Sequence, residues 1–371
     1  MPFSLGWVDH DQGARDRIHE ILAHLREPGV RDELGIGTIR DSFASLLFPG
    51  TSTVQTRLRY FLIVPWVYRS LEEGGAVGGE IWRMGEELER EVAKHLALTR
   101  EKGVIGKRGG RRLASSVYWT GLGAWGLRHE PGGRNGSSIW HRGLPLRPSG
   151  FPEFDTLALT AREAEYIRDR VAQAVPGSLL AHLFLHPRSV KCGFAWEHPD
   201  YEGFSSSHKE TLQHARLFSE VIDGALLLYS LLLARRAGRE EKVGEYQLKL
   251  ETWSTRLDGE ALRNWSLPDF WMTVRRGRRI NPSAQHFVGR WIDYAKSGAL
   301  NAANHGFPGD NSAPARLVRR REKALKRLRS RFSNQRMLDE WNGGSGVYRM
   351  GYRWYKVRGY LDELVAGLSR G

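Results

Sequence analysis

Residues 208–236 read HKETLQHARLFSEVIDGALLLYSLLLARR, a long and mostly apolar stretch with helical periodicity. Its apolar run over 225–234 is about half as long as a bilayer span requires. The stretch therefore predicts a core helix, at the centre of a C-terminal core, and not a membrane span. The side chains that we expect to be buried are Leu217, Phe218, Val221, Ile222, Ala225 and Leu228.

Helical periodicity extends outward from this stretch in both directions. Further helices are predicted over residues 10–26, 38–48, 51–64, 79–98, 178–184, 265–274, 286–295, 315–340 and 351–368. Thr160 and Glu163 match the capping box that begins a helix, whereas Pro65 is expected to kink or restart the helix that contains it. The predicted fold is mainly α, with many helices, a possible helix-turn-helix-like N-terminal unit and a larger helical C-terminal domain.

Two glycine-rich stretches interrupt the helical pattern. Residues 101–112 read EKGVIGKRGGRR and predict a loop. Residues 130–155 are rich in Gly, Pro and Ser and have almost no periodicity. We therefore expect a helical N-terminal domain over 1–130 with a helix-turn-helix-like segment at 38–64, a linker over 131–156, and a helical C-terminal domain over 157–371 with a basic helix at 315–332.

The charge balance points to polyanions as partners. The chain of 371 residues has 56 Lys and Arg against 42 Asp and Glu, which gives a formal charge of +14. Its one cysteine, Cys192, cannot form an internal disulfide or a zinc site by itself. The first residues, MPFSLGWVDHDQ, lack the basic and apolar regions of a signal peptide. We expect a cytoplasmic protein with nucleic acid, DNA favoured, as partner and no membrane contact.

The densest basic cluster lies in ARLVRRREKALKRLRSRF, residues 315–332. On a helical wheel Leu317, Val318, Leu325, Leu328 and Phe332 form one apolar stripe, and most basic residues lie opposite. This pattern predicts a packed helix with a basic face suited to phosphate contact. The alternative is a solvated arginine face that binds nothing. The candidate nucleic-acid contacts are Arg316, Arg319, Arg320, Lys323, Lys326 and Arg327.

Two smaller clusters are further candidates for phosphate contact. One lies in the glycine-rich loop, where backbone N–H groups can approach phosphates closely, although the order of residues is not that of a phosphate-binding Walker loop. The other follows Trp271. Flexible or solvated surface arginines are the alternative for both. The candidate residues are Lys107, Arg108, Arg111, Arg112, Arg275, Arg276, Arg278 and Arg279.

Residues 34–65 have the look of a helix-turn-helix, with a Pro-Gly turn followed by a hydroxyl-rich segment. The start of the second helix would then face nucleic acid. Thr53 and Gln55 would offer polar contacts, and Arg57 and Arg59 ionic ones. A structural helical hairpin, in which the hydroxyl groups only cap the helix, remains the alternative.

Catalytic motifs are missing from the sequence. It contains no HExxH or GxSxG motif and no recognisable nuclease signature. We therefore expect neither a catalytic centre nor a metal or other cofactor, although an unrecognised nuclease site stays open.

The block RDELGIGTIRDSFASLLFPGTSTVQTRLRYFLIVPW, residues 31–66, resembles the hallmark of a bacterial family of unknown function, DUF6361. Similar matches occur at LGWVDHD (5–11), at 215–234 and at LPDFW (267–271), so the resemblance covers nearly the whole chain. It implies an association with antiphage defence islands, near helicase and nuclease genes. The resulting hypothesis is a non-catalytic DNA-binding accessory subunit that positions a helicase or nuclease. The alternatives are a scaffold subunit of a defence complex and an unrecognised nuclease.

Overall fold

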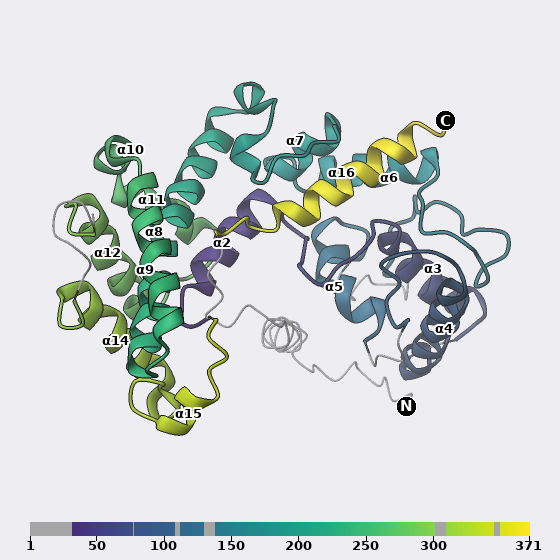
Figure 1. The fold of residues 1–371 in the computed structure, drawn as a ribbon. Helices are drawn as coiled ribbons and strands as arrows, with labels where there is room; N and C mark the ends of the chain where they lie inside the picture. Colours follow the sequence, from purple (N-terminus) through teal and green to yellow (C-terminus); the bar gives the residue numbers. More distant parts are fainter. Residues whose placement is uncertain (1–31, 77, 108–111, 130–137, 301–308, 345–348) are drawn as a thin grey trace, which may run out of the picture. The chain divides into compact units, whose positions relative to one another are not determined.

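The computed structural model describes residues 32–76, 78–107, 112–129, 138–300, 309–344 and 349–371. The helix predicted over 10–26 lies outside these residues. Within them the fold is mainly α, as predicted, and the β-structure of this part of the chain amounts to one isolated bridge between Arg128 and Trp140. The chain packs into two units. Figure 1 labels their helices and colours them by position in the sequence.

The first unit contains residues 44–204 and 353–371. Its core is the apolar helix α3, in which every side chain from Tyr60 to Tyr68 is buried. The ring of Phe61 stacks on that of Trp125 with 3.8 Å between ring centroids. Helices α4 and α5 pack on α3, while α6, α7 and α16 pack on one another. The bounds are Tyr60–Glu73 (α3), Gly79–Leu98 (α4), Ala114–Ala124 (α5), Ala161–Ala174 (α6), Leu179–Leu185 (α7) and Trp354–Leu368 (α16).

The second unit contains the described residues 32–43 and 205–352. Its centre is α8, Ser206–Arg236, against which α9, α12 and α14 pack (Figure 1). All six side chains predicted to be buried on this helix are buried. The other helices are Glu240–Arg256 (α9), Gly259–Asn264 (α10), Leu267–Gly277 (α11), Pro282–Lys296 (α12), Ala313–Lys326 (α14) and Gln335–Asp339 (α15). Helix α2, Gly37–Leu47, begins in this unit and ends in the first.

The length of α8 exceeds that of the apolar run seen in the sequence. By length and composition the whole helix could cross a bilayer, but 94% of its most apolar 18-residue window is buried inside the protein. The neighbouring helices α9, α12 and α14 therefore take the place that lipid would have around a membrane span. The prediction of a core helix is confirmed.

Local capping signals in the sequence are confirmed where their partners lie nearby. The side chain of Thr160 accepts a hydrogen bond from the backbone N–H of Glu163, and the carboxylate of Glu163 accepts one from the backbone N–H of Thr160. These two bonds satisfy donors that the first turn of α6 would otherwise leave unpaired. At α7 the side chain of Ser178 accepts a single cap hydrogen bond, from the backbone N–H of Ala181.

The helix predicted to begin near Thr51 begins nine residues later, at Tyr60, so that prediction was wrong. Polar side chains hold residues 51–59 as a loop instead. The hydroxyl of Thr51 donates to the carbonyl of Phe48, and the amide of Gln55 donates to the carbonyl of Gly50. The phenol oxygen of Tyr118 accepts the backbone N–H groups of Thr56 and Arg57. Hydroxyl side chains that suit a helix cap also suit such turns.

Two other expectations about helix boundaries also need correction. Pro65 lies inside α3, which continues to Glu73 without a break. The helix predicted over 315–340 is divided, because α14 ends at Lys326 and a 3₁₀ turn over Arg327–Arg329 separates it from α15. Arg327 has a left-handed φ of 49°, which stops the α-helix there. The division into 1–130, 131–156 and 157–371 stays a prediction.

Gly224 on α8 lies against the ring of Trp253 on α9. A Cβ atom at this position would lie 2.2 Å from the ring of Trp253. The indole N–H of Trp253 donates to the carbonyl of Glu220 at 2.7 Å, which holds the ring in place. We therefore expect Gly224→Ala to lower the free energy of unfolding by about 1–3 kcal/mol, measured by urea denaturation.

A matched control lies on α9. Gly244 is exposed, and a Cβ atom added there would have no neighbour within 4 Å, so Gly244→Ala should raise stability by up to about 1 kcal/mol. Equal stability of the Gly224→Ala protein and the wild type would contradict this description of the α8–α9 contact.

Candidate nucleic-acid interface

Helix α14 buries a different face from the one that its apolar residues predicted. Val318 is buried as expected, and Phe332, beyond the helix, is buried too. Leu325 is 41% exposed and Leu328 is 89% exposed, whereas Arg321 and Glu322 are buried. The predicted apolar stripe was therefore wrong at its C-terminal half, because two charged side chains occupy the inner face.

Arg321 is buried because it binds backbone carbonyls of a distant segment. Its guanidinium donates to the carbonyl of Leu34 at 2.8 Å, to that of Gly35 at 3.1 Å and to the hydroxyl of Ser283 at 2.7 Å. It also lies over the ring of Phe287, 5.6 Å from the centroid. Burial lowers the pKa of Arg321 from its usual value. This arginine joins α14 to α12 and to residues 34–35.

Two buried carboxylates, those of Glu33 and Glu322, bind the remaining polar side chains on the buried face of α14 and in the segment after it. Glu33 accepts hydrogen bonds from Arg331 at 2.9 Å and from the phenol of Tyr229 at 3.3 Å, and it pairs with Lys326. Glu322 accepts the hydroxyl of Ser330 and the backbone N–H of Arg331, the latter at 2.8 Å. Lys326, a predicted phosphate contact, thus already has an internal partner of opposite charge.

Four cations remain exposed along α14 and at the residue that ends it. Arg316, Arg320 and Lys323 follow one another at spacings of four and three residues, which places them on one side of α14, and Arg327 follows directly after the last residue of that helix. All four are exposed. None of them makes an ion pair with another residue in the described part of the chain. We call these four residues the basic stripe.

A pocket of about 490 Å³ lies beside the basic stripe. Its lining residues come from the end of α8, from the turn before α14, from α14 itself and from the segment after it. The residues are Arg235, Arg236, Asp310, Arg319, Lys323 and Phe332. We call this cavity the basic pocket.

Asp310 organises the basic pocket. Its carboxylate pairs with Arg235 at 2.8 Å and with Arg319 at 3.1 Å. Arg319 also donates to the backbone carbonyl of Asp310 at 2.6 Å and lies over the ring of Phe332. Arg235 and Arg236 were not predicted as contacts. They lie in the last turn of an apolar helix, where basic residues are common because they interact favourably with the negative end of the helix dipole.

The arginine cluster that follows Trp271 lies at the end of α11. Arg275, Arg276 and Arg279 are exposed, and Arg278 is half-buried. Arg275 donates to the side chain of Gln285 at 3.1 Å. A second hollow, of about 440 Å³, lies nearby and is lined by Trp271, Pro282, Gln285, His286, Gly289, Arg290 and Asp293.

The glycine-rich cluster is described only in part. Lys107 and Arg112 are exposed, and Arg108 and Arg111 lie outside the described residues. A phosphate contact by this loop stays a prediction.

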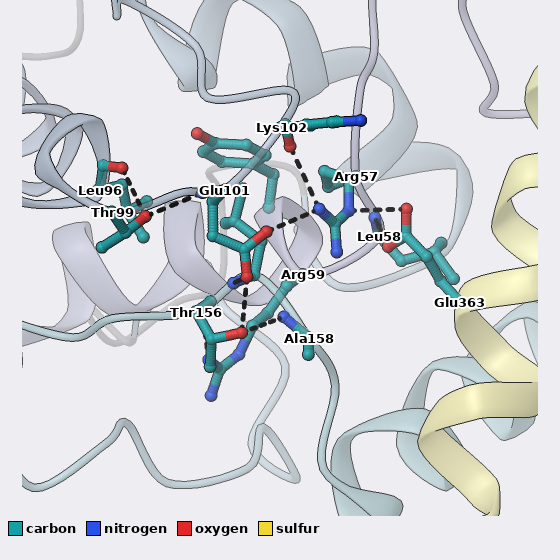
Figure 2. A network of polar contacts seen from close by, with 12 residues as sticks. Arg57, Leu58, Arg59, Leu96, Thr99, Glu101, Lys102, Thr156, Ala158 and Glu363 are labelled. Carbon is teal, nitrogen blue, oxygen red and sulfur yellow. Dashed lines mark hydrogen bonds and ion pairs between the residues drawn. The ribbon is translucent and has the colours of Figure 1, made fainter.

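The four candidates in residues 51–59 are held within the first unit. Arg57 bridges two carboxylates, Glu101 and Glu363, at 2.9 Å each, as Figure 2 shows. Arg59 is buried and pairs with Glu163 at 2.8 Å. Gln55 is buried, Thr53 is half-buried, and neither lies in the first turn of a helix. Their predicted contact with nucleic acid stays a prediction, but internal pairing already accounts for both arginines.

Burial of Glu363 makes this network sensitive to pH. Desolvation raises the pKa of Glu363 to about 7, although Arg57 and the N–H of Leu58 act in the opposite direction. A raised pKa means that folding takes up a proton between the unfolded pKa, about 4.3, and pH 7. The stability that the neutral carboxyl contributes is therefore present below about pH 4 and lost as the pH rises to 7.

We expect the free energy of unfolding of the wild type to fall, relative to Glu363→Gln, between about pH 4 and pH 7. Denaturant titrations at several pH values measure this difference. Glu245→Gln is the control, because its partners Lys242 and Lys249 lower the pKa of Glu245 and move its titration below that window. Parallel pH profiles for the wild type and Glu363→Gln would contradict the assignment.

Within the described residues, no group of three or more His, Cys, Asp or Glu side chains is arranged to hold a metal ion. The comparison with curated proteins and the comparison with solved structures find no match. The model of a family of unknown function, DUF6361, matches residues 2–367. That match spans nearly the whole length of the sequence. The chain therefore belongs to the DUF6361 family.

Proposed function

We propose that this protein is a non-catalytic DNA-binding subunit of a bacterial antiphage defence system, where it positions a helicase or nuclease partner in the cytoplasm. The observation that carries the proposal is the basic stripe of α14. Four exposed cations without ion pairs in the described part of the chain, three on one face of α14 and one at its end, match the regular negative charge of a nucleic-acid backbone. Because the phosphates are common to all sequences, such a contact supports binding without strong sequence preference.

Some of the basic side chains are used inside the fold and are not available to a ligand. Arg321, Lys326 and Arg331 neutralise or satisfy buried groups in the second unit. Arg57 and Arg59 do the same in the first. The positive charge available to a ligand is therefore more localised than the total of +14 indicates. This localisation favours the basic stripe and the basic pocket over the 51–59 segment, whose two arginines are paired internally.

A second candidate function is that of a scaffold subunit. Leu325 and Leu328 are exposed at the end of α14, next to the basic stripe. Exposed apolar side chains that lie together can mark a protein contact. In this case a partner protein, and not nucleic acid, would cover the C-terminal end of α14.

Reversal of the basic stripe separates these two functions. In the variant with Arg316, Arg320, Lys323 and Arg327 all replaced by Glu, we expect the affinity for a duplex oligonucleotide at low salt to fall by at least about 100-fold. The physical reason is the replacement of four attractive phosphate contacts by four repulsive ones. Fluorescence anisotropy of a labelled duplex measures the change.

The control carries the same change of net charge on other exposed cations that have no ion pair in the described part of the chain. These residues are Lys94, Arg100, Arg162 and Arg263. We expect this control to retain most of the affinity. Equal losses in both variants would mean that only net charge matters, and failure of the wild type to bind would leave the scaffold function.

A further inference from the structure

The basic pocket contains more positive charge than Asp310 can neutralise. Four cations line it, namely Arg235, Arg236, Arg319 and Lys323, against the one carboxylate. Asp310 pairs with Arg235 and Arg319. Arg236 and Lys323 make no ion pair with any residue that the structure describes. The positive charges of Arg236 and Lys323 are therefore not neutralised by a carboxylate in the pocket lining, because Asp310 is already paired with the two other arginines.

The paired arginines are already held in the geometry that an oxyanion requires. The two carboxylate oxygens of Asp310 bind one guanidinium each, and the side chains of Arg235 and Arg319 are only about a quarter exposed. The backbone carbonyl of Asp310 and the ring of Phe332 restrain Arg319 from two further sides. Such preorganisation lowers the entropic cost of binding an anion. Arginine also matches the oxygens of phosphate as well as those of carboxylate.

The excess positive charge of the basic pocket favours a phosphate group with two negative charges over a group with one. An internal phosphodiester carries one negative charge, whereas a terminal phosphate carries close to two at neutral pH. The terminal phosphate can therefore interact with both Arg236 and Lys323. Asp310 remains in the pocket wall and reduces this attraction without cancelling it.

The shape of the site favours the end of a strand. The pocket is a concave space of about 490 Å³, within the range of cavities that hold small ligands such as nucleotides. Lys323 belongs both to this pocket and to the exposed basic stripe. A strand whose backbone follows the stripe can thus reach the pocket with its terminal nucleotide.

We propose that the basic pocket binds the terminal phosphate of a nucleic-acid strand, with Arg236 and Lys323 as direct contacts and Asp310 as the residue that holds Arg235 and Arg319 in place. This inference rests on the proposed function, since it assumes that the basic stripe binds the same strand. It adds a preference for phosphorylated ends, which binding along a helix face alone does not produce.

The test compares labelled single-stranded and duplex oligonucleotides of one sequence with a 5′-phosphate, a 3′-phosphate or hydroxyl ends. We expect a phosphorylated end to bind the full-length protein about tenfold more tightly than hydroxyl ends. The two phosphorylated forms show which end is recognised. A hydroxyl-ended oligonucleotide two nucleotides longer controls for the added charge, and it should bind like the shorter one.

Two variants connect the preference to the pocket. Arg236→Gln should reduce the tenfold preference to about twofold, because it removes a contact to the terminal phosphate. Asp310→Asn should strengthen binding of phosphorylated ends more than that of hydroxyl ends and so widen the preference, because the Asp310 carboxylate repels two negative charges more strongly than one, whereas damage to the fold would weaken binding of every strand.

The results separate this inference from the proposed function. Equal affinity for phosphorylated and hydroxyl ends, with binding still dependent on the basic stripe, would overturn the inference and leave the proposed function standing. An unchanged preference in Arg236→Gln and Asp310→Asn would place recognition of the end outside the pocket and would also overturn it. Absence of binding to every oligonucleotide would reject the proposed function itself.

Discussion

Two buried carboxylates, Glu33 and Glu322, each bind hydrogen-bond donors or cations inside the second unit. These contacts determine which face of α14 points outward. A buried carboxylate is strongly unfavourable unless hydrogen bonds and opposite charge compensate it. Arg331, Lys326 and Tyr229 supply that compensation for Glu33, while Ser330 and the backbone of Arg331 do so for Glu322. Rotation of α14 about its axis would expose or separate these partners. The helix is therefore held in one orientation, with the basic stripe on the outer side.

The same arrangement explains why a very basic segment can be part of a packed unit. Residues 315–332 contain nine cations, which would repel one another if all of them faced the same way. Arg321 instead reaches the carbonyls of Leu34 and Gly35, and Arg331 and Lys326 reach Glu33. This division leaves part of the charge for structure and part for a ligand. The basic pocket repeats the principle on a smaller scale, with Asp310 holding two arginines.

Features set by neighbouring residues could be predicted from the sequence, and features set by distant ones could not. The burial of α8 follows from its apolar periodicity, and the capping box of α6 follows from Thr160 and Glu163, three residues apart. The burial of Arg321 could not be predicted, because its partner Leu34 lies 287 residues away in the sequence. Arg235 joins the basic pocket only through Asp310, 75 residues further along the chain. The hydroxyl groups after Gly50 suited a helix start and a turn equally, and Tyr118 decides for the turn.

The central claim is that the basic stripe binds a nucleic-acid backbone by releasing its counterions. The most direct measurement is the affinity of the wild-type protein for a duplex as a function of salt concentration. For four phosphate contacts, the logarithm of the association constant should fall against the logarithm of the salt concentration with a slope of about −3.6. A slope near zero, or no measurable binding at low salt, would contradict this claim.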